Sequence, residues 1–203
     1  MTALAYTVAF EGIEARMVEV QCAVAPGIPA FSIVGLPDKA VSEARERVRS
    51  ALSSMAIALP SKRITINLSP ADLPKIGSHF DLPIAVALLA ALEIIPADDA
   101  EKTVALGELS LNGNLVPVLG ALPAAMAAAS EDRTLLCPYA CGPEAAWVGT
   151  ANVIAARTLA DVIRHYNGKS VIAPSRPGEV MQAAQARDLS EVKGQERAKR
   201  AIE

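Results

Sequence analysis

The sequence predicts a mixed α/β (or α+β) domain in which helices cover a sheet. Two features of the pattern support this class. The first third of the chain alternates apolar and polar residues as strands do, whereas helical and strand-like segments alternate in the remainder. An Asn-Gly pair at 112–113 also lies between two apolar runs, which is a strong hairpin signal. Hydrophobic residues make up 52% of the chain but aromatic residues only 3%, so small aliphatic side chains must fill the core.

The N-terminal third is predicted to be rich in strands. Four segments alternate apolar and polar residues, at 4–10, 14–24, 30–36 and 63–70. Each is bounded by a turn that contains Gly or Pro, or by a change from strand-like to helical spacing of the apolar residues. Between the last two, apolar residues recur at helical spacing. This pattern predicts a helix that begins at Pro37, carries Asp38 in its first turn and extends to Met55.

The second half is predicted to alternate helices and strands. A buried helix is expected from Leu82 to Ile95, where Pro96 stops it. The hairpin at Asn112-Gly113 follows, and both of its turn residues are expected to have positive φ. The later elements are a helix at 121–129, a strand at 134–138, a helix at 144–148, a strand at 152–156 and a helix at 159–166.

Composition and termini exclude several classes of protein. The apolar run from Leu82 to Leu92 is shorter than the roughly 18 residues that span a bilayer, and the N-terminus lacks a signal-peptide pattern. The three cysteines form no disulfide framework, which favours a cytoplasmic location. The net charge of −3 gives no bulk attraction to nucleic acid or acidic membranes. No membrane partner is expected.

The C-terminal part divides into two short regions. Residues 168–187 lose apolar periodicity and contain Pro174, Pro177 and Gly178, so they are predicted to be a linker without packing of its own. Residues 188–203 then start a helix near Gln195 that stops in mid-turn. We therefore interpret 1–167 as one domain and 188–203 as the truncated start of a second module.

Common catalytic motifs are missing from the sequence. It contains no phosphate-binding G-x-x-x-x-G-K-[ST] loop, no G-x-S-x-G and no H-E-x-x-H. Cys137 and Cys141 are spaced as C-x3-C, but zinc needs about four ligands and the two histidines are distant in sequence. We therefore expect inert thiols and no metal site.

One group of basic residues is a candidate binding surface. Arg45 and Arg49 share a face of the helix after Pro37, and Lys62 and Arg63 follow it. These cations could contact nucleic-acid phosphates or an adjacent subunit. The alternative is an ordinary solvated helix face, on which Glu43 pairs with Arg47, and the scarcity of aromatic residues favours this second interpretation.

Three segments, in this order, resemble a known family: "AFSIVGLPDKAVSEARERVRSAL", "NLSPADLPKIGSHFDLPIAVALLAAL" and "GELSLNGNLVPVLGAL". Together they are similar to the N-terminal domain of the YifB/ComM group of magnesium-chelatase-like AAA+ ATPases. That domain resembles the proteolytic domain of Lon and the C-terminal domain of the RadA recombination protein. The closing segment "DLSEVKGQERAKRAIE" is similar to the opening of the AAA+ module of the same group.

The resemblance implies how the whole protein works. The motor would use ATP and Mg, would assemble with neighbouring subunits in a ring, and would process DNA, as in branch migration during recombination or natural transformation. Val192, Lys193 and Gly194 would lie beside the nucleotide, which later residues would hold; this fragment would bind no cofactor by itself. An alternative is a chelatase-type motor that remodels a protein or a metal-insertion complex, and a third is an active peptidase.

The resemblance to Lon also tests for peptidase chemistry. Lon-type peptidases use a serine that a lysine activates. Matching the motifs places His79 at the serine position, next to Ser78, and Leu122 at the lysine position. No lysine lies between Lys102 and Lys169, so a small alignment error cannot restore the pair. We therefore expect a Lon-like fold without catalytic residues.

Overall fold

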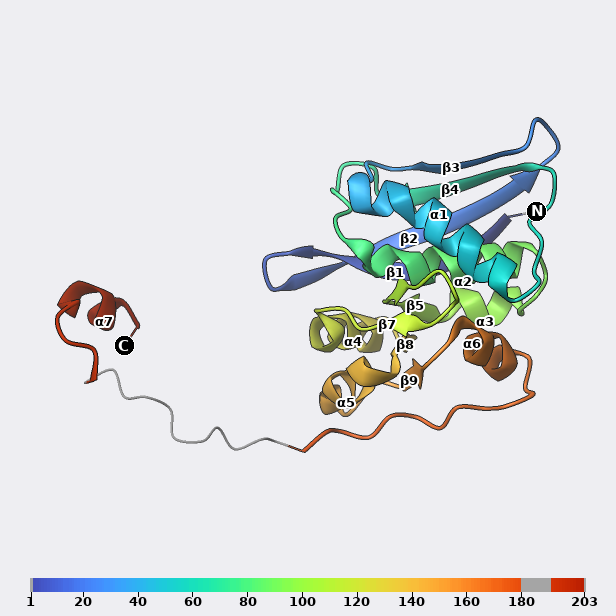
Figure 1. Ribbon diagram of the computed structural model, residues 1–203. Helices are drawn as coiled ribbons and strands as arrows, with labels where there is room; N and C mark the ends of the chain where they lie inside the picture. Colours follow the sequence, from blue (N-terminus) through green and yellow to red (C-terminus); the bar gives the residue numbers. More distant parts are fainter. Residues whose placement is uncertain (1, 180–190, 203) are drawn as a thin grey trace.

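The computed structural model describes residues 2–179 and 191–202 (Figure 1). Within them, seven strands form one sheet in the order β3-β4-β2-β1-β5-β8-β9. The pairs β1/β2 and β2/β4 are antiparallel and the other neighbouring pairs are parallel, so only β2 runs against the rest. These strands are β1 (Thr2–Glu11), β2 (Glu14–Ala25), β3 (Ala30–Val34), β4 (Arg63–Ser69), β5 (Thr103–Ala105), β8 (Thr134–Pro138) and β9 (Val153–Ala156).

Helices cover the sheet, which confirms the predicted mixed α/β class. They are α1 (Lys39–Ser54), α2 (Asp81–Ala91), α3 (Ala97–Glu101), α4 (Ala121–Ser130), α5 (Gly142–Ala145) and α6 (Leu159–Tyr166), with α7 (Glu196–Ile202) after the undescribed segment. The strands alternate their side chains between two buried clusters. In β8, for example, Leu136 packs with the residues of α1, α2 and α6, whereas Leu135 and Cys137 pack with those of α4 and α5.

Helix α2 is the centre of the larger cluster. Every residue from Asp81 to Ala91 is buried, and the helix packs against β1 and β2 on one side and α1 on the other. Alanines of β1 face it, which explains why the core needs so few aromatic residues. Every described helix is too short or too polar to cross a lipid bilayer.

The structure corrects two predicted helix boundaries and adds one helix. Pro37 precedes α1, and Asp38 is its N-cap, accepting a 2.7 Å hydrogen bond from the Val41 amide. Helix α2 ends at Ala91 and not at Ile95, because Glu93 adopts a positive φ and the Ile94 amide turns back to the Leu89 carbonyl. This turn buries Ile95, and the short helix α3, absent from the sequence prediction, follows it.

The hairpin at 112–113 is confirmed, but its turn differs from the expected type. It joins β6 (Glu108–Leu109) to β7 (Leu115–Val116) in a separate two-stranded sheet. Only Gly113 of the Asn-Gly pair has a positive φ, of 82°, and its amide bonds to the Ser110 carbonyl. The Ser110 hydroxyl binds the Asn112 side chain, and this contact fixes the turn without a left-handed residue at 112.

The first part of the predicted linker contacts the domain, contrary to the expectation that it lacks packing. Three amides of this C-terminal strap, residues 170–178, donate to the domain: Ile172 to His165 Nδ1, Ser175 to Val153 O and Gly178 to Pro143 O, at 2.8–3.1 Å. These residues are spaced by three and are less exposed than their neighbours, as in an extended strand with three residues per turn. The strap thereby follows the β9 edge of the sheet.

We predict that the strap amides of Ile172 and Ser175 exchange hydrogen slowly, because both donate to acceptors of the domain. Hydrogen exchange read residue by residue by NMR would measure this. The Ala173 amide is the internal control, since Ala173 is exposed and donates to no acceptor in the described part of the chain. Equal, rapid exchange at all three positions would show that the strap does not dock in solution.

Candidate functional site

The motifs matched to Lon meet at a cavity of about 430 Å³. One wall is the loop before α2, from Ile76 to His79, and another is the 117–119 segment that follows β7. Phe10 of β1 and Glu108 of β6 complete it. The fold therefore brings together two segments that lie about 40 residues apart in the sequence, as the comparison with a peptidase site requires.

His79, at the matched serine position, is a buried structural residue. Only 6% of it is exposed, its Nε2 lies 2.9 Å from the Val8 carbonyl oxygen, and its ring packs between Phe10 and Phe80. A carbonyl only accepts hydrogen bonds, so Nε2 carries the proton. Burial lowers the pKa of His79 below its usual 6.5, although the bond to Val8 opposes this shift. At neutral pH the imidazole is therefore uncharged and links β1 to the start of α2.

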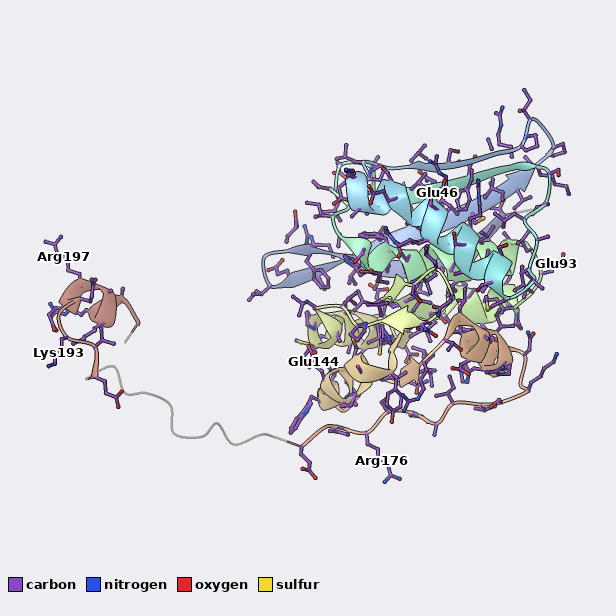
Figure 2. The ribbon with its side chains drawn as sticks, viewed as in Figure 1. Glu46, Glu93, Glu144, Arg176, Lys193 and Arg197 are labelled. Atoms are coloured by element: carbon purple, nitrogen blue, oxygen red, sulfur yellow. The ribbon has the colours of Figure 1, made fainter. Side chains whose placement is uncertain are left out.

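The cavity holds no pair of residues arranged as a nucleophile and its base. Ser78 lines the cavity, but its hydroxyl has no hydrogen-bond partner in the described part of the chain. Leu122 lies in the first turn of α4, is 37% exposed and does not line the cavity. Its amide instead donates a hydrogen bond to the carboxylate of Glu144 in α5 (labelled in Figure 2), at 3.3 Å. A serine hydroxyl that is not hydrogen-bonded to a base is not arranged as an activated nucleophile.

The pKa of His79 leads to a pH prediction. Its folded pKa lies below the unfolded value of about 6.5, so the unfolded state binds the extra proton first as the pH falls. The stability from burying neutral His79 is therefore complete above about pH 6.5 and is lost as the pH falls below it. We expect the unfolding free energy of the wild type to fall between pH 7.5 and 5.5 more steeply than that of His79→Gln in urea titrations.

The control for this prediction is His165→Gln, because His165 is the other histidine of the chain. Burial also lowers the pKa of His165, but that ring is only half-buried. The variant His165→Gln should therefore flatten the pH dependence of the unfolding free energy less than His79→Gln does. If His79→Gln left the pH dependence of the unfolding free energy unchanged, the burial of a neutral His79 would not be its cause.

A buried ion pair between α1 and α2 lies next to this cavity. Arg47 Nε and Nη2 donate to the two carboxylate oxygens of Asp81 at 2.6 and 2.9 Å, and Asp81 also accepts the Leu109 amide at 3.1 Å. The side chain of Asp81 is fully buried and that of Arg47 is 21% exposed. The hydrogen bond to Asp81 raises the pKa of Arg47, so the guanidinium stays charged.

Sequence reasoning missed this pair. Glu43 does lie 3.9 Å from Arg47, as predicted, but the closer partner is Asp81, 34 residues away, and Arg47 is not on a solvated face. The signal that would have found it is Asp81 itself. A carboxylate at the start of an otherwise apolar helix becomes buried with that helix and must then have a cationic partner.

The structure brings together part of the predicted basic group. Arg49 and Lys62 line one pocket, between the C-terminal half of α1 and the N-terminal end of β3. Arg45 lies one turn earlier, where it pairs with Glu46 at 3.0 Å and donates to the Phe31 carbonyl at 3.5 Å. Arg63 starts β4 and does not line the pocket. Among the described residues, Arg49, Lys62 and Arg63 have no ion-pair partner.

The cysteines are buried thiols. Burial raises the pKa of Cys22 and of Cys137 to about 12, and it also raises that of Cys141, whose Sγ donates to the Val118 carbonyl at 3.4 Å. Thiols with such pKa values stay protonated and are poor ligands and nucleophiles. In residues 2–179 and 191–202, no three His, Cys, Asp or Glu side chains lie close enough to hold a metal ion.

Val192, Lys193 and Gly194 form the turn before α7. Gly194 and Gln195 both have positive φ, of 74° and 61°, and helix α7 then begins at Glu196. Val192 is 44% exposed, and Figure 2 shows the Lys193 side chain pointing outward just before the helix. The start of a helix after this turn agrees with the sequence prediction. A role beside a nucleotide stays a prediction.

Comparison with known proteins identifies the family. The model of the family described as "Subunit ChlI of Mg-chelatase" matches residues 18–140. The chain is 40% identical to "Competence protein ComM" of Haemophilus influenzae over 206 residues, which cover 98% of this chain and 40% of that protein. It is 38% identical to "Uncharacterized protein YifB" of Escherichia coli and 37% identical to that of Salmonella typhimurium, with 98% and 99% of this chain covered.

The chain spans about two fifths of the length of these relatives. The match to the family extends from within β2 to just past β8, so it contains the ion pair between Arg47 and Asp81, and His79 with the residues that line its cavity except Phe10. The resemblance seen in the three sequence segments is thereby confirmed. The chain belongs to the magnesium-chelatase ChlI family, in the group that includes YifB and ComM.

Proposed function

We propose that this chain is the non-catalytic, Lon-like N-terminal domain of a cytoplasmic AAA+ ATPase that processes DNA, in branch migration, recombination or natural transformation. The observation that carries the proposal is the 40% identity to a competence protein along 98% of the chain. Competence is a DNA-uptake function, and a motor that remodels incoming or branched DNA fits it. The domain would serve the motor by assembly and positioning and not by chemistry.

The geometry around His79 supports the non-catalytic part of this proposal. The position matched to the peptidase serine holds a buried imidazole that is hydrogen-bonded to Val8, and the position matched to the lysine holds Leu122. A leucine side chain cannot accept a proton, and Ser78 has no hydrogen-bond partner among the described residues. The cavity lined by Ser78 and His79 would then be a remnant of the fold.

ATP and Mg would act elsewhere in the full-length protein. This chain has no phosphate-binding loop, so its own residues do not fit the phosphates of a nucleotide. Val192 to Gly194 would at most contact the base in a site that later residues complete.

The test of the function is an assay of ATP-dependent branch migration on a four-way DNA junction, with the full-length protein. We expect the junction to be resolved into duplexes only in the presence of ATP and Mg. A full-length protein that does not bind the junction, and whose ATP hydrolysis does not change when DNA is added, would contradict a DNA-processing role. A parallel assay with fluorescent casein should show no cleavage by the wild type, and cleavage that Ser78→Ala abolishes would contradict the non-catalytic assignment.

A chelatase-type motor that acts on a protein or a metal-insertion complex is the second candidate. The observation that favours it is the match of residues 18–140 to a family described by a subunit of magnesium chelatase. The same full-length preparation separates the two candidates. The chelatase interpretation requires that a protein partner, and not branched DNA, stimulates ATP hydrolysis.

A further inference from the structure

The loop that joins β1 to β2 presents an exposed apolar side chain between two carboxylates. This hairpin tip, residues 11–14, contains Glu11, Gly12, Ile13 and Glu14, and Ile13 is 93% exposed. Gly12 has a φ of 63° and no atom within 4 Å of the position of a Cβ, so the turn extends into open space. Figure 1 shows this hairpin projecting beyond the other elements at one end of the sheet. An isoleucine so fully exposed on a protruding tip is suited to enter a pocket of another molecule.

A pocket of complementary character lies at the other end of the same sheet. This Arg49 pocket has a volume of about 450 Å³, and the side chains of Ile57, Leu59 and Ile64 contribute to its apolar lining. Arg49 and Lys62 add two positive charges that no carboxylate of the described residues neutralises. An apolar lining with two unpaired cations fits an apolar side chain flanked by carboxylates.

The tip and the pocket cannot meet within one molecule. Strand β2 begins at Glu14 of the tip and ends at Ala25, directly before the turn that leads to Pro29 of the pocket. Twelve extended residues separate the two by roughly 40 Å. In Figure 1 the β1–β2 hairpin lies at one side, and the β2–β3 turn with the end of α1 lies at the opposite side. Any contact between them joins two copies of the chain.

We propose that the hairpin tip of one copy inserts Ile13 into the Arg49 pocket of the next copy, with Glu14 facing Arg49 and Lys62. Two different surfaces then meet at each contact, so the arrangement is head-to-tail. Such a contact closes into a ring when the rotation between copies permits it and otherwise continues as a filament. Within a molecule, Glu11 already lies 3.2 Å from Arg16, on an exposed surface, so Glu14 is the carboxylate free to form the new pair.

Nucleic acid is the less suitable occupant of the Arg49 pocket. Its one aromatic lining residue, Phe31, is 5% exposed and cannot stack on a base. Phosphate contacts alone would leave the apolar lining exposed.

A single loop in a single pocket buries less surface than a stable protein–protein interface, which is typically about 800 Å² on each side. The contact is therefore weak between two copies and becomes useful when several act together in a closed assembly.

Disulfide trapping with this chain of 203 residues tests the proposal. The double variant Ile13→Cys/Ser61→Cys places one thiol on the tip and one at the rim of the pocket, and the native cysteines are buried. A disulfide requires Cα atoms about 4.4–6.8 Å apart, so the two new thiols cannot pair within one molecule. We expect mild oxidation to give a ladder of cross-linked oligomers on a non-reducing gel. The matched control Ile13→Cys/Ser130→Cys moves the second thiol to the exposed end of α4 and should give at least about tenfold less ladder.

Single-cysteine variants then distinguish the geometry of the contact. Ile13→Cys mixed with Ser61→Cys should give cross-linked dimers and nothing larger, because each copy carries one thiol. Cross-linking of Ile13→Cys with itself would show a symmetric contact between tips and would overturn the proposal. So would a double variant that forms no more ladder than the control.

Charge reversal separates the subunit contact from a nucleic-acid contact. In the trapping variant, adding Arg49→Glu should reduce the ladder at least about tenfold, and adding Glu14→Arg to that variant should restore it. If Arg49→Glu leaves the ladder unchanged and instead abolishes binding of the full-length protein to DNA, the pocket is a nucleic-acid surface and the proposal fails. Because this readout is cross-linking, its outcome is independent of the proposed function in DNA processing.

Discussion

Replacing Arg47 by leucine is expected to destabilise the domain by about 3–5 kcal/mol, because it leaves the buried carboxylate of Asp81 without its cation. Leucine fills much of the same space between α1 and α2, so the loss comes from the unpaired charge and not from a cavity. Urea unfolding followed by circular dichroism would measure the change. A free-energy loss below about 1 kcal/mol would show that Asp81 finds another partner.

The pH dependence of Arg47→Leu identifies the cause of the loss. Burial already raises the pKa of Asp81 above its usual value, and Arg47 opposes that shift. Without Arg47 the folded pKa of Asp81 rises further above the unfolded value, so the penalty appears above the unfolded pKa and grows as the pH rises to the folded one. The variant should therefore lose more stability, relative to the wild type, at pH 8 than at pH 5. A loss that does not depend on pH would indicate a packing defect instead.

The matched control for Arg47→Leu lies two residues away on the same helix. Arg45 is 46% exposed and pairs with Glu46 at the surface, where an ion pair contributes about 0–1 kcal/mol. Arg45→Leu should therefore change the unfolding free energy by less than about 1 kcal/mol. The double variant Arg47→Leu/Asp81→Leu removes both charges and should recover part of the stability lost by Arg47→Leu alone.

Replacing Gly35 by alanine is expected to cost about 3 kcal/mol or more, for two reasons that add. The residue has a φ of 103°, which alanine adopts only with strain of about 1–3 kcal/mol. The new Cβ would also overlap the backbone carbonyl of Leu68 in β4, and backbone cannot move aside as a side chain can. Accommodating that overlap adds roughly 1–3 kcal/mol. Thermal unfolding of the variant would measure the total loss of unfolding free energy from strain and overlap.

Gly149→Ala is the control that separates strain from overlap. Gly149 also has a positive φ, of 70°, but no atom lies within 4 Å of the position of its Cβ. Its replacement should cost only the strain, about 1–2 kcal/mol. If Gly35→Ala proved no more destabilising than Gly149→Ala, the chain would have room between β3 and β4 that the structure does not show.

The elements themselves could be read from the sequence. Periodicity and turn residues predicted the helix at 159–166 and the strand at 134–138 with the bounds that the structure has. These signals are local. A capping box at Thr158 and Asp161 starts the helix, and side chains that alternate between two buried faces define the strand. The family was also recognisable, because its motifs are continuous stretches of sequence.

The end of α2 could not be predicted in the same way. The apolar run from Leu82 to Leu92 resumes after Glu93 with Ile94 and Ile95, and only Pro96 beyond them is an evident stop signal for the helix. The helix ends early because Glu93 turns the chain and Ile95 is then buried against the core. Burial against other elements decides between two conformations that the local sequence allows about equally.

The sequence by itself determined the class of fold, the family and the absence of a phosphate-binding loop, since each depends on which residues follow one another. Only the tertiary structure decided what the charged residues contact. Arg47 meets Asp81 across 34 residues, and Arg49 and Lys62 share a pocket although a loop separates them. Partners of this kind depend on how helices pack on the sheet, and packing energies are summed over the whole core. The same packing places the exposed Ile13 at the far end of β2 from that pocket.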